Sequence, residues 1–309
     1  MTATADMILE RRRSRRKLAF WRIAAIVLFL VTVLALVPWR SALGPDRGGD
    51  HVARIQIDGV ITDDSKRTET IRKLAERESV KALIVDIASP GGTVVGSEAL
   101  YESLRHVAAK KPVVAVVGEI AASGGYIAAI GADHIVTRQN SITGSIGVIT
   151  QVPNVTGLLE KLGVEVREVK SSPLKAQPSP FTDPSEDAIE ALDALIEDSY
   201  AWFRDLVAER RGLEGEALSR VADGRVFTGR QAQERGLVDA IGAEPEARDW
   251  LASTHEVSAD LKVRDYDWTD RPLPFPLDML ENAGLDFWRA GVEGINLSPG
   301  PRLMALYTG

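Results

Sequence analysis

The spacing of hydrophobic residues along this chain switches repeatedly between the period of a strand and the period of a helix. This switching predicts strands that alternate with helices. Residues 51–62 (HVARIQIDGVIT) alternate and are rich in β-branched side chains, which is typical of a strand. Residues 81–88 and 112–117 are apolar runs, as in strands covered on both faces of a parallel sheet. Residues 69–78 and 97–110 instead carry apolar residues at helical spacing.

The same alternation continues towards the C-terminus. Further strands are expected at residues 134–137, 147–150 and 164–169, and further helices at residues 123–131, 187–211 and 228–235. Strands that alternate with helices predict an α/β domain with parallel pairing, which we place at residues 51–262. Residues 263–309 form a proline-rich C-terminal extension, with one amphipathic piece at residues 277–292.

A long uncharged run precedes this domain and predicts a membrane segment. Residues 23–39 are apolar and end at Trp39, with Trp21 just before them, as in a helix that spans a bilayer. Seven basic residues lie within residues 1–22, and such residues stay on the cytoplasmic side. We therefore expect a retained single-pass signal anchor in a bacterial inner membrane, with the domain on the periplasmic side. Residues 40–50 would be a linker. The alternative is a cleaved signal peptide.

Composition narrows the class of protein. The chain has 309 residues, 45% of them hydrophobic, so a sizeable core can form without disulfides. Its net charge of −7 argues against nucleic acid as a partner. The absence of cysteine excludes a thiol nucleophile, a disulfide framework and a zinc–thiolate site. No motif indicates a cofactor or a metal, and we expect neither.

The segment AASGGY at residues 121–126 is the strongest chemical signal. Ser123 follows an apolar strand and precedes a predicted helix, whose N-terminus favours developing negative charge. A second glycine-rich turn, SPGG at residues 89–92, offers another backbone N–H, so that two N–H groups could hold an oxyanion. The pattern indicates acyl transfer at Ser123, and peptide hydrolysis above all. The alternatives are close helix–strand packing at Ser123 and a simple capping turn at residues 89–92.

A serine nucleophile needs a base, and the sequence offers histidines and lysines. The histidines lie outside polar, glycine-rich contexts and are expected to be structural: His51, His106, His134 and His255. Lys170 and Lys175 lie among small, apolar and proline residues, with no acidic residue between them and Asp183. Burial without a counter-charge lowers the pKa of a lysine, as a neutral base requires. The alternative is an ordinary exposed loop.

In their order along the chain, these motifs resemble the short form of the signal peptide peptidase A (protease IV) family. That family comprises membrane-anchored serine proteases within the Clp protease/crotonase-like fold. The matching segments are SPGG (89–92), ASGGY (122–126), ITGSIGV (142–148), residues 170–181, DGRVFTG (223–229) and residues 232 and 236–239. The resemblance implies a β-α-β spiral core with a long helical element.

The resemblance also implies roles for individual residues. Ser123 would be the nucleophile and Lys175 the general base, because the proline and phenylalanine pattern after Lys175 matches the family. The remaining site residues would be backbone groups around the serine: an oxyanion hole at Gly92 and Gly124, and substrate contacts at Gly91, Gly144, Ser145 and Ile146. Residues 143–148 would present a strand edge to an extended peptide. Relatives of this length form homo-oligomeric rings in which the serine of one subunit works with the lysine of its neighbour.

We therefore expect a membrane-anchored serine endopeptidase with a Ser/Lys dyad and an acyl-enzyme. Its substrates would be cleaved signal peptides or other membrane-proximal apolar peptides. One alternative is a crotonase-type acyl-CoA enzyme that uses Glu98 or Glu119, but acyl-CoA is not expected outside the membrane. The other alternative is a non-catalytic membrane scaffold, against which the serine and the lysine argue.

Overall fold

The computed structural model describes residues 21–22, 25–29 and 49–268. The chain divides into two units, Met1–Tyr266 and Asp267–Gly309, and only Asp267 and Trp268 of the second are described. Among the described residues, no helix is both long and apolar enough to cross a membrane. The anchor expected at residues 23–39 lies outside the described residues except for residues 25–29, and the piece expected at residues 277–292 lies outside them entirely.

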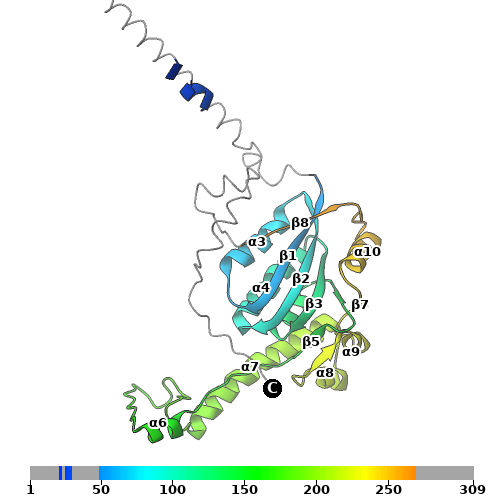
Figure 1. The fold of residues 1–309 in the computed structure, drawn as a ribbon. Coiled ribbons are helices and arrows are strands. Elements are labelled where there is room, and N and C mark those ends of the chain that lie inside the picture. Colours follow the sequence, from blue (N-terminus) through cyan, green and yellow to red (C-terminus); the bar gives the residue numbers. More distant parts are fainter. Residues whose placement is uncertain (1–20, 23–24, 30–48, 269–309) are drawn as a thin grey trace, which may run out of the picture. The chain divides into compact units, whose positions relative to one another are not determined.

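An eight-stranded sheet forms the centre of the first unit (Figure 1). Its strands are β1 His51–Ile61, β2 Val80–Gly92, β3 Val113–Ala122, β4 His134–Thr137, β5 Ile142–Gly144, β6 Val226–Thr228, β7 Ala240–Ile241 and β8 Lys262–Asp265. The order is β6-β5-β3-β2-β1-β8, with β4 beside β3 and β7 beside β4. All pairs are parallel except β5 with β6. The expected α/β fold with parallel strands is confirmed.

Helices cover both faces of this sheet. The helices within residues 49–268 are α3 Ser65–Glu76, α4 Val94–Ala108, α5 Gly124–Ile130, α6 Thr156–Leu162, α7 Glu186–Arg211, α8 Gly215–Val221, α9 Gly229–Glu234 and α10 Glu244–His255. Figure 1 shows α3 and α4 on one side of the sheet and α10 on the other. Ala247 and Leu251 of α10 pack on buried strand residues such as Ile84 and Val114. Burial on both faces explains why the central strands are continuously apolar.

One edge of β3 is shared by two strands in succession. Val114 to Val117 pair with β4, whereas Ile120 to Ala122 pair with β5. The sheet therefore divides beyond Val117, where the last residues of β3 leave β4 and pair with β5. This division directs the chain into the turn that carries Ser123.

Two of the expected strands are wrong. Residues 147–150 are not a strand, because β5 takes the position beside β3 and the chain leaves the sheet at Ser145, where φ is 53°. Residues 164–169 alternate as a strand would, yet within the described part of the chain they pair with no other strand. Their valines are exposed, and Val169 fully so. A period of two sets only which side chains share a face; hydrogen-bonded neighbours are also needed.

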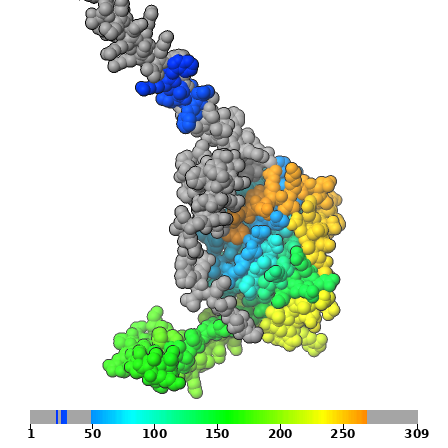
Figure 2. Space-filling view, in the orientation of Figure 1, coloured from blue at the N-terminus to red at the C-terminus, as the bar shows by residue number. Residues whose placement is uncertain are grey.

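Residues 150–199, which we call the arm, comprise α6 and the N-terminal half of α7. Nearly all of these residues are exposed or only half-buried. Figure 2 shows the green residues of the arm as a lobe beside the rest of the unit. Its exposed apolar residues include Val152, Leu158, Leu162, Val164, Val166, Val169, Leu174, Phe181, Ile189 and Leu195. The arm thus carries an apolar surface that the other described residues leave uncovered.

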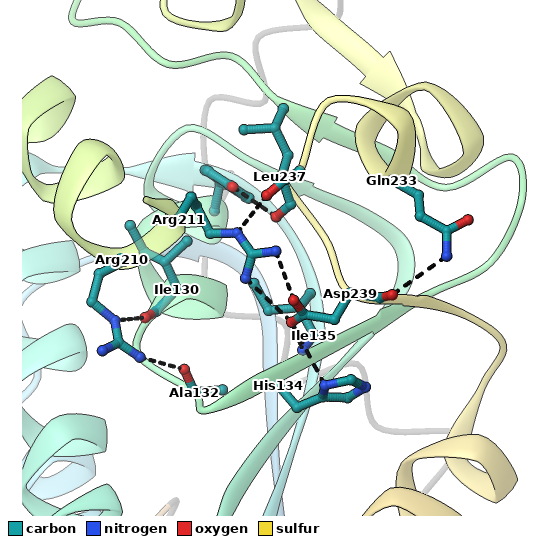
Figure 3. A network of polar contacts seen from close by, with 11 residues as sticks. Ile130, Ala132, His134, Ile135, Arg210, Arg211, Gln233, Leu237 and Asp239 are labelled. Atoms are coloured by element: carbon teal, nitrogen blue, oxygen red, sulfur yellow. Dashed lines mark hydrogen bonds and ion pairs between the residues drawn. The ribbon is translucent and has the colours of Figure 1, made fainter. Parts of the chain in front are cut away.

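The C-terminal end of α7 is fastened to the sheet by two arginines (Figure 3). Arg211 donates to both carboxylate oxygens of Asp239, at 2.7 and 3.2 Å, and to the Gly236 carbonyl at 2.7 Å. Asp239 also accepts from the Ile135 N–H at 2.8 Å, which ties the pair to β4. The Arg211 side chain is 12% exposed, so this ion pair is largely removed from water.

The neighbouring arginine reaches the helix that follows Ser123. Arg210 donates to the carbonyls of Ile130 and Ala132, both at 2.9 Å, at the C-terminal end of α5. Tyr126, fully buried in the first turns of α5, donates to the Leu237 carbonyl at 2.8 Å. The position of α5 is therefore set by α7 and by the segment 236–239.

Replacing Asp239 should destabilise the fold strongly. Asp239→Ala leaves the Arg211 guanidinium without its carboxylate and the Ile135 N–H without its acceptor, and such losses cost about 3 kcal/mol. The measurement is the free energy of unfolding in urea. Glu69→Ala is the matched control, because it removes only the exposed pair with Lys73 and should cost less than about 1 kcal/mol. If the two substitutions lowered the free energy of unfolding equally, the stabilising role of Asp239 would be contradicted.

Stability should fall as the pH drops below neutrality. Burial lowers the pKa of both His51 and His134 beneath the usual value of about 6.5. Between the folded and unfolded pKa values the unfolded chain binds more protons, so this stability is complete above about pH 6.5 and is lost as the pH falls. The double variant His51→Gln/His134→Gln should unfold with a flatter pH dependence. The exposed His106→Gln serves as control, and an unchanged slope in the double variant would refute the explanation.

Candidate active site

Ser123 lies between β3 and α5 in a backbone conformation that few residues other than glycine adopt. Its φ is 52° and its ψ is −119°. Its N–H donates to the Gly144 carbonyl at 2.8 Å, and its own carbonyl accepts from the N–H groups of Tyr126 and Ile127. Strain of this kind costs about 1–3 kcal/mol and clusters at active sites. The side chain makes no capping bond to α5, so the hydroxyl is left available for chemistry.

The two glycine-rich turns meet at this serine. A Cβ placed on Gly91, whose φ is 118°, would lie 2.9 Å from the Ser123 Cβ and 3.0 Å from the Gly124 nitrogen. A Cβ on Gly124 would lie 3.1 Å from the Gly92 nitrogen. Gly124 is the first residue of α5, so its N–H has no acceptor within the helix. The backbone nitrogens of Gly92 and Gly124 are thus neighbours beside the Ser123 side chain.

Ser123, Gly92 and Gly124 line a hollow of about 80 Å³. The other residues that line it come from α4, α5, α7 and the segment after β5: Val94, Ser97, Ile127, Gly147, Val148, Ile149, Trp202 and Phe203. Apart from Ser97, these side chains are apolar, aromatic or absent. The hollow is thus small and mainly apolar.

Three of the residues expected to contact substrate, Gly144, Ser145 and Ile146, do not line the hollow. Gly144 holds the Ser123 N–H, the Ser145 N–H donates to the Arg225 carbonyl at 2.8 Å, and Ile146 is fully buried. A free strand edge is expected over residues 143–148. Strand β5 has β3 on one side and β6 on the other, so residues 143–144 offer no free edge, and residues 145–148 lie outside the strand. Residues 147–149 line the hollow instead.

The two candidate lysines lie in the arm. Figure 1 shows α6 and the segment that follows it at the far end of α7, and Lys175 is exposed there. Within the described part of the chain its ammonium group has no hydrogen bond or ion pair, and Lys175 does not line the hollow. Lys170 donates to Glu168 at 2.7 Å, so the expectation that it lacks a nearby acidic partner is wrong. One chain alone does not bring Ser123 and Lys175 together.

The other candidate bases also lie elsewhere. His51 bonds the Tyr266 hydroxyl, and His134 stacks on Trp250, as expected for structural histidines. None of the residues that line the hollow is histidine, aspartate or glutamate. Neither Glu98 nor Glu119, the residues that the crotonase alternative would use, lines this hollow.

Sequence reasoning missed the contribution of α7 to the site. Trp202 and Phe203 line the hollow, and Phe203 is almost fully buried. The signal was present, because aromatic residues occur in this helix only at positions 200–203. Helical periodicity places them on a buried stripe but does not say that this stripe reaches the serine.

Comparison with known proteins shows the family to which the chain belongs. Residues 105–258 match Peptidase family S49. A Synechocystis protein named "Putative protease" is 43% identical over 226 residues, which cover 72% of this chain and 80% of that protein. "Putative signal peptide peptidase SppA" of Enterococcus faecium is 32% identical over 229 residues, covering 70% and 66%. "Protease 4" of Haemophilus influenzae is 32% identical over 220 residues, covering 71% and 33%. The chain belongs to peptidase family S49.

Proposed function

We propose that this chain is a membrane-anchored serine endopeptidase of the signal peptide peptidase type, with Ser123 as nucleophile. The observation that carries the proposal is the strained, uncapped Ser123 beside the backbone nitrogens of Gly92 and Gly124. A serine in such a strand-to-helix turn exposes its Oγ, as in other serine hydrolases. The division of the sheet at β3 supports the Clp protease/crotonase-like spiral as the core.

The reaction proceeds through an acyl-enzyme. Neutral Lys175 takes the hydroxyl proton as the Ser123 Oγ attacks the scissile carbonyl carbon. The N–H groups of Gly92 and Gly124 hold the resulting oxyanion. When the C–N bond breaks, the lysine ammonium returns the proton to the leaving amine. A water molecule then gives a proton to Lys175 as its oxygen attacks the ester carbonyl carbon. When the bond between that carbon and the Ser123 Oγ breaks, Lys175 returns the proton to the Ser123 Oγ.

The lysine comes from a neighbouring subunit in a homo-oligomeric ring. Two features support this assignment: Lys175 lies in the arm, apart from the hollow of its own chain, and the arm exposes many apolar side chains. Exposed apolar surface of this kind is typical of protein interfaces. Between the two lysines, the ion pair of Lys170 with Glu168 favours Lys175 as the base.

The substrates are cleaved signal peptides or other apolar peptides close to the membrane. The small, mainly apolar hollow beside Ser123 suits a small apolar side chain at the scissile bond. Residues 147–149 and Gly91 flank the path of the peptide, with Gly144, Ser145 and Ile146 supporting it from below. The anchor at residues 23–39 places this site on the periplasmic side of the inner membrane.

Substitution of the dyad should abolish turnover. Ser123→Ala and Lys175→Ala in the full-length chain in detergent should each lower kcat/KM for an apolar peptide by roughly 10³-fold or more. Lys170→Ala should lose less than about tenfold, because it removes no proton-transfer group. Labelling by a fluorophosphonate should disappear in Ser123→Ala.

Two results would overturn these assignments. Retained turnover in Ser123→Ala would refute the serine protease mechanism, and hydration of an enoyl-CoA would revive the crotonase alternative. An active Lys175→Ala beside an inactive Lys170→Ala would reverse the choice of base.

Mixing two inactive variants should restore activity. In oligomers formed from Ser123→Ala and Lys175→Ala chains, a Ser123 of one chain can meet a Lys175 of the other. If the variants assemble at random in equal amounts, roughly a quarter of the sites become complete. The measurement is peptide turnover after dissociation and reassembly of the mixture. No recovery, with mixed oligomers demonstrated by differential tagging, would show that the dyad forms within one chain.

A further inference from the structure

In the segment that carries Lys175, three side chains donate hydrogen bonds to one carboxylate, that of Glu168. Glu168 accepts hydrogen bonds from Lys170 at 2.7 Å and from the Gln177 side-chain amide at 3.3 Å. Its other oxygen accepts from the Ser179 hydroxyl. Lys170 precedes Lys175 in the chain, whereas Gln177 and Ser179 follow it. One side chain therefore joins both sides of the loop of residues 170–179.

Lys175 lies at the tip of that loop. Its N–H donates to the Ser172 carbonyl at 3.2 Å, and the Gln177 N–H donates to the Leu174 carbonyl at 3.3 Å. Two turns thus overlap at Lys175, and the next residue, Ala176, has a φ of 58°. The tip is shaped by the backbone, while the Lys175 side chain extends from it without a partner among the described residues.

The base of the loop is better shielded than the rest of the arm. The side chains of Glu168 and Lys170 are 22% and 24% exposed, although both residues as a whole are exposed because their backbone faces solvent, and Ser179 is 4% exposed. Hydrogen bonds to a carboxylate in such surroundings are stronger than neutral ones. The bonds from Lys170 and then Ser179 lower the pKa of Glu168, so the carboxylate stays ionised across the neutral range.

Because the loop lies on an exposed arm, it needs hydrogen bonds such as those to Glu168 to hold it in one conformation. Holding each residue in one conformation costs conformational entropy, and a free lysine side chain adds to that cost. A proton acceptor displaced by about 1 Å from its serine can cost about 10²-fold in rate. Packing does not supply the order here, because the residues at the tip, Leu174 and Lys175, are exposed.

We propose that Glu168 is a positioning residue that presents Lys175 to the serine of the neighbouring subunit. This inference rests on the proposed function, since it needs Lys175 to be the base. Glu168 itself touches neither the substrate nor the reacting atoms. It acts by joining the two ends of the loop of residues 170–179 through its hydrogen bonds. The tip with Lys175 then enters the partner's site in the conformation that proton transfer requires.

The test compares Glu168→Ala with a carboxylate in the same segment. Among the residues that the structure describes, Glu165 bonds Arg167 alone, and both side chains are more than 70% exposed, so Glu165→Ala is the matched control. In the full-length chain, Glu168→Ala should lower kcat for a peptide roughly 10- to 100-fold, with KM changed less than about threefold. Glu168→Gln should recover part of the loss, because its amide oxygen still accepts from Ser179. Glu165→Ala should match the wild type.

Oligomer mass and thermal midpoint are measured for every variant. An unchanged kcat in Glu168→Ala would overturn the proposal, and so would a loss that follows dissociation of the oligomer and is not relieved by Gln. If Glu168→Ala does not fold, Ser179→Ala replaces it, with a smaller fall in kcat expected and no fall contradicting the proposal. An active Lys175→Ala would defeat the proposed function itself. An inactive Lys175→Ala beside a fully active Glu168→Ala would defeat this inference alone.

Discussion

The close approach of two backbone turns, at the end of β2 and the start of α5, is the constraint on which the site depends. A Cβ on Gly125 would lie 2.5 Å from the Ser89 carbonyl oxygen, and one on Gly91 would lie 3.0 Å from the Gly124 nitrogen. No side chain fits between these turns, so their N–H groups and Ser123 come within a few ångströms of one another. The bonds of Ser123 to Gly144 and to its own helix then maintain the strained serine.

The sequence predicted this part of the molecule well, because its signals are local. Apolar runs specify the central strands, and glycine beside a small nucleophile specifies the turn. The path after β5 was misjudged, since the alternation at residues 147–150 does not reveal that β6 closes the edge of β5 from far along the chain. Helix α10 and the contribution of Trp202 also depend on contacts between distant segments, which periodicity does not encode.

The lysine was the hardest residue to place from sequence. Proline and small residues around Lys170 and Lys175 suggested burial, yet the loop is exposed in one chain. Glu168 was overlooked as a partner of Lys170, although it lies only two positions before it. If the lysine loop is completed by a neighbour, its surroundings are not a property of one chain, and composition alone cannot distinguish a surface awaiting a partner from a surface facing water.

Helix α7 has a consequence for the spacing of neighbouring sites. Its C-terminal end is fixed by Arg210 and Arg211, its middle lines the hollow with Trp202 and Phe203, and its N-terminal end adjoins the lysine segment. With 26 residues it is about 39 Å long, and it sets the distance between its fixed C-terminal end and the segment that carries Lys175. A one-residue insertion would rotate everything beyond it by about 100°, so drift in the length of this helix is constrained even where its surface residues are free to vary.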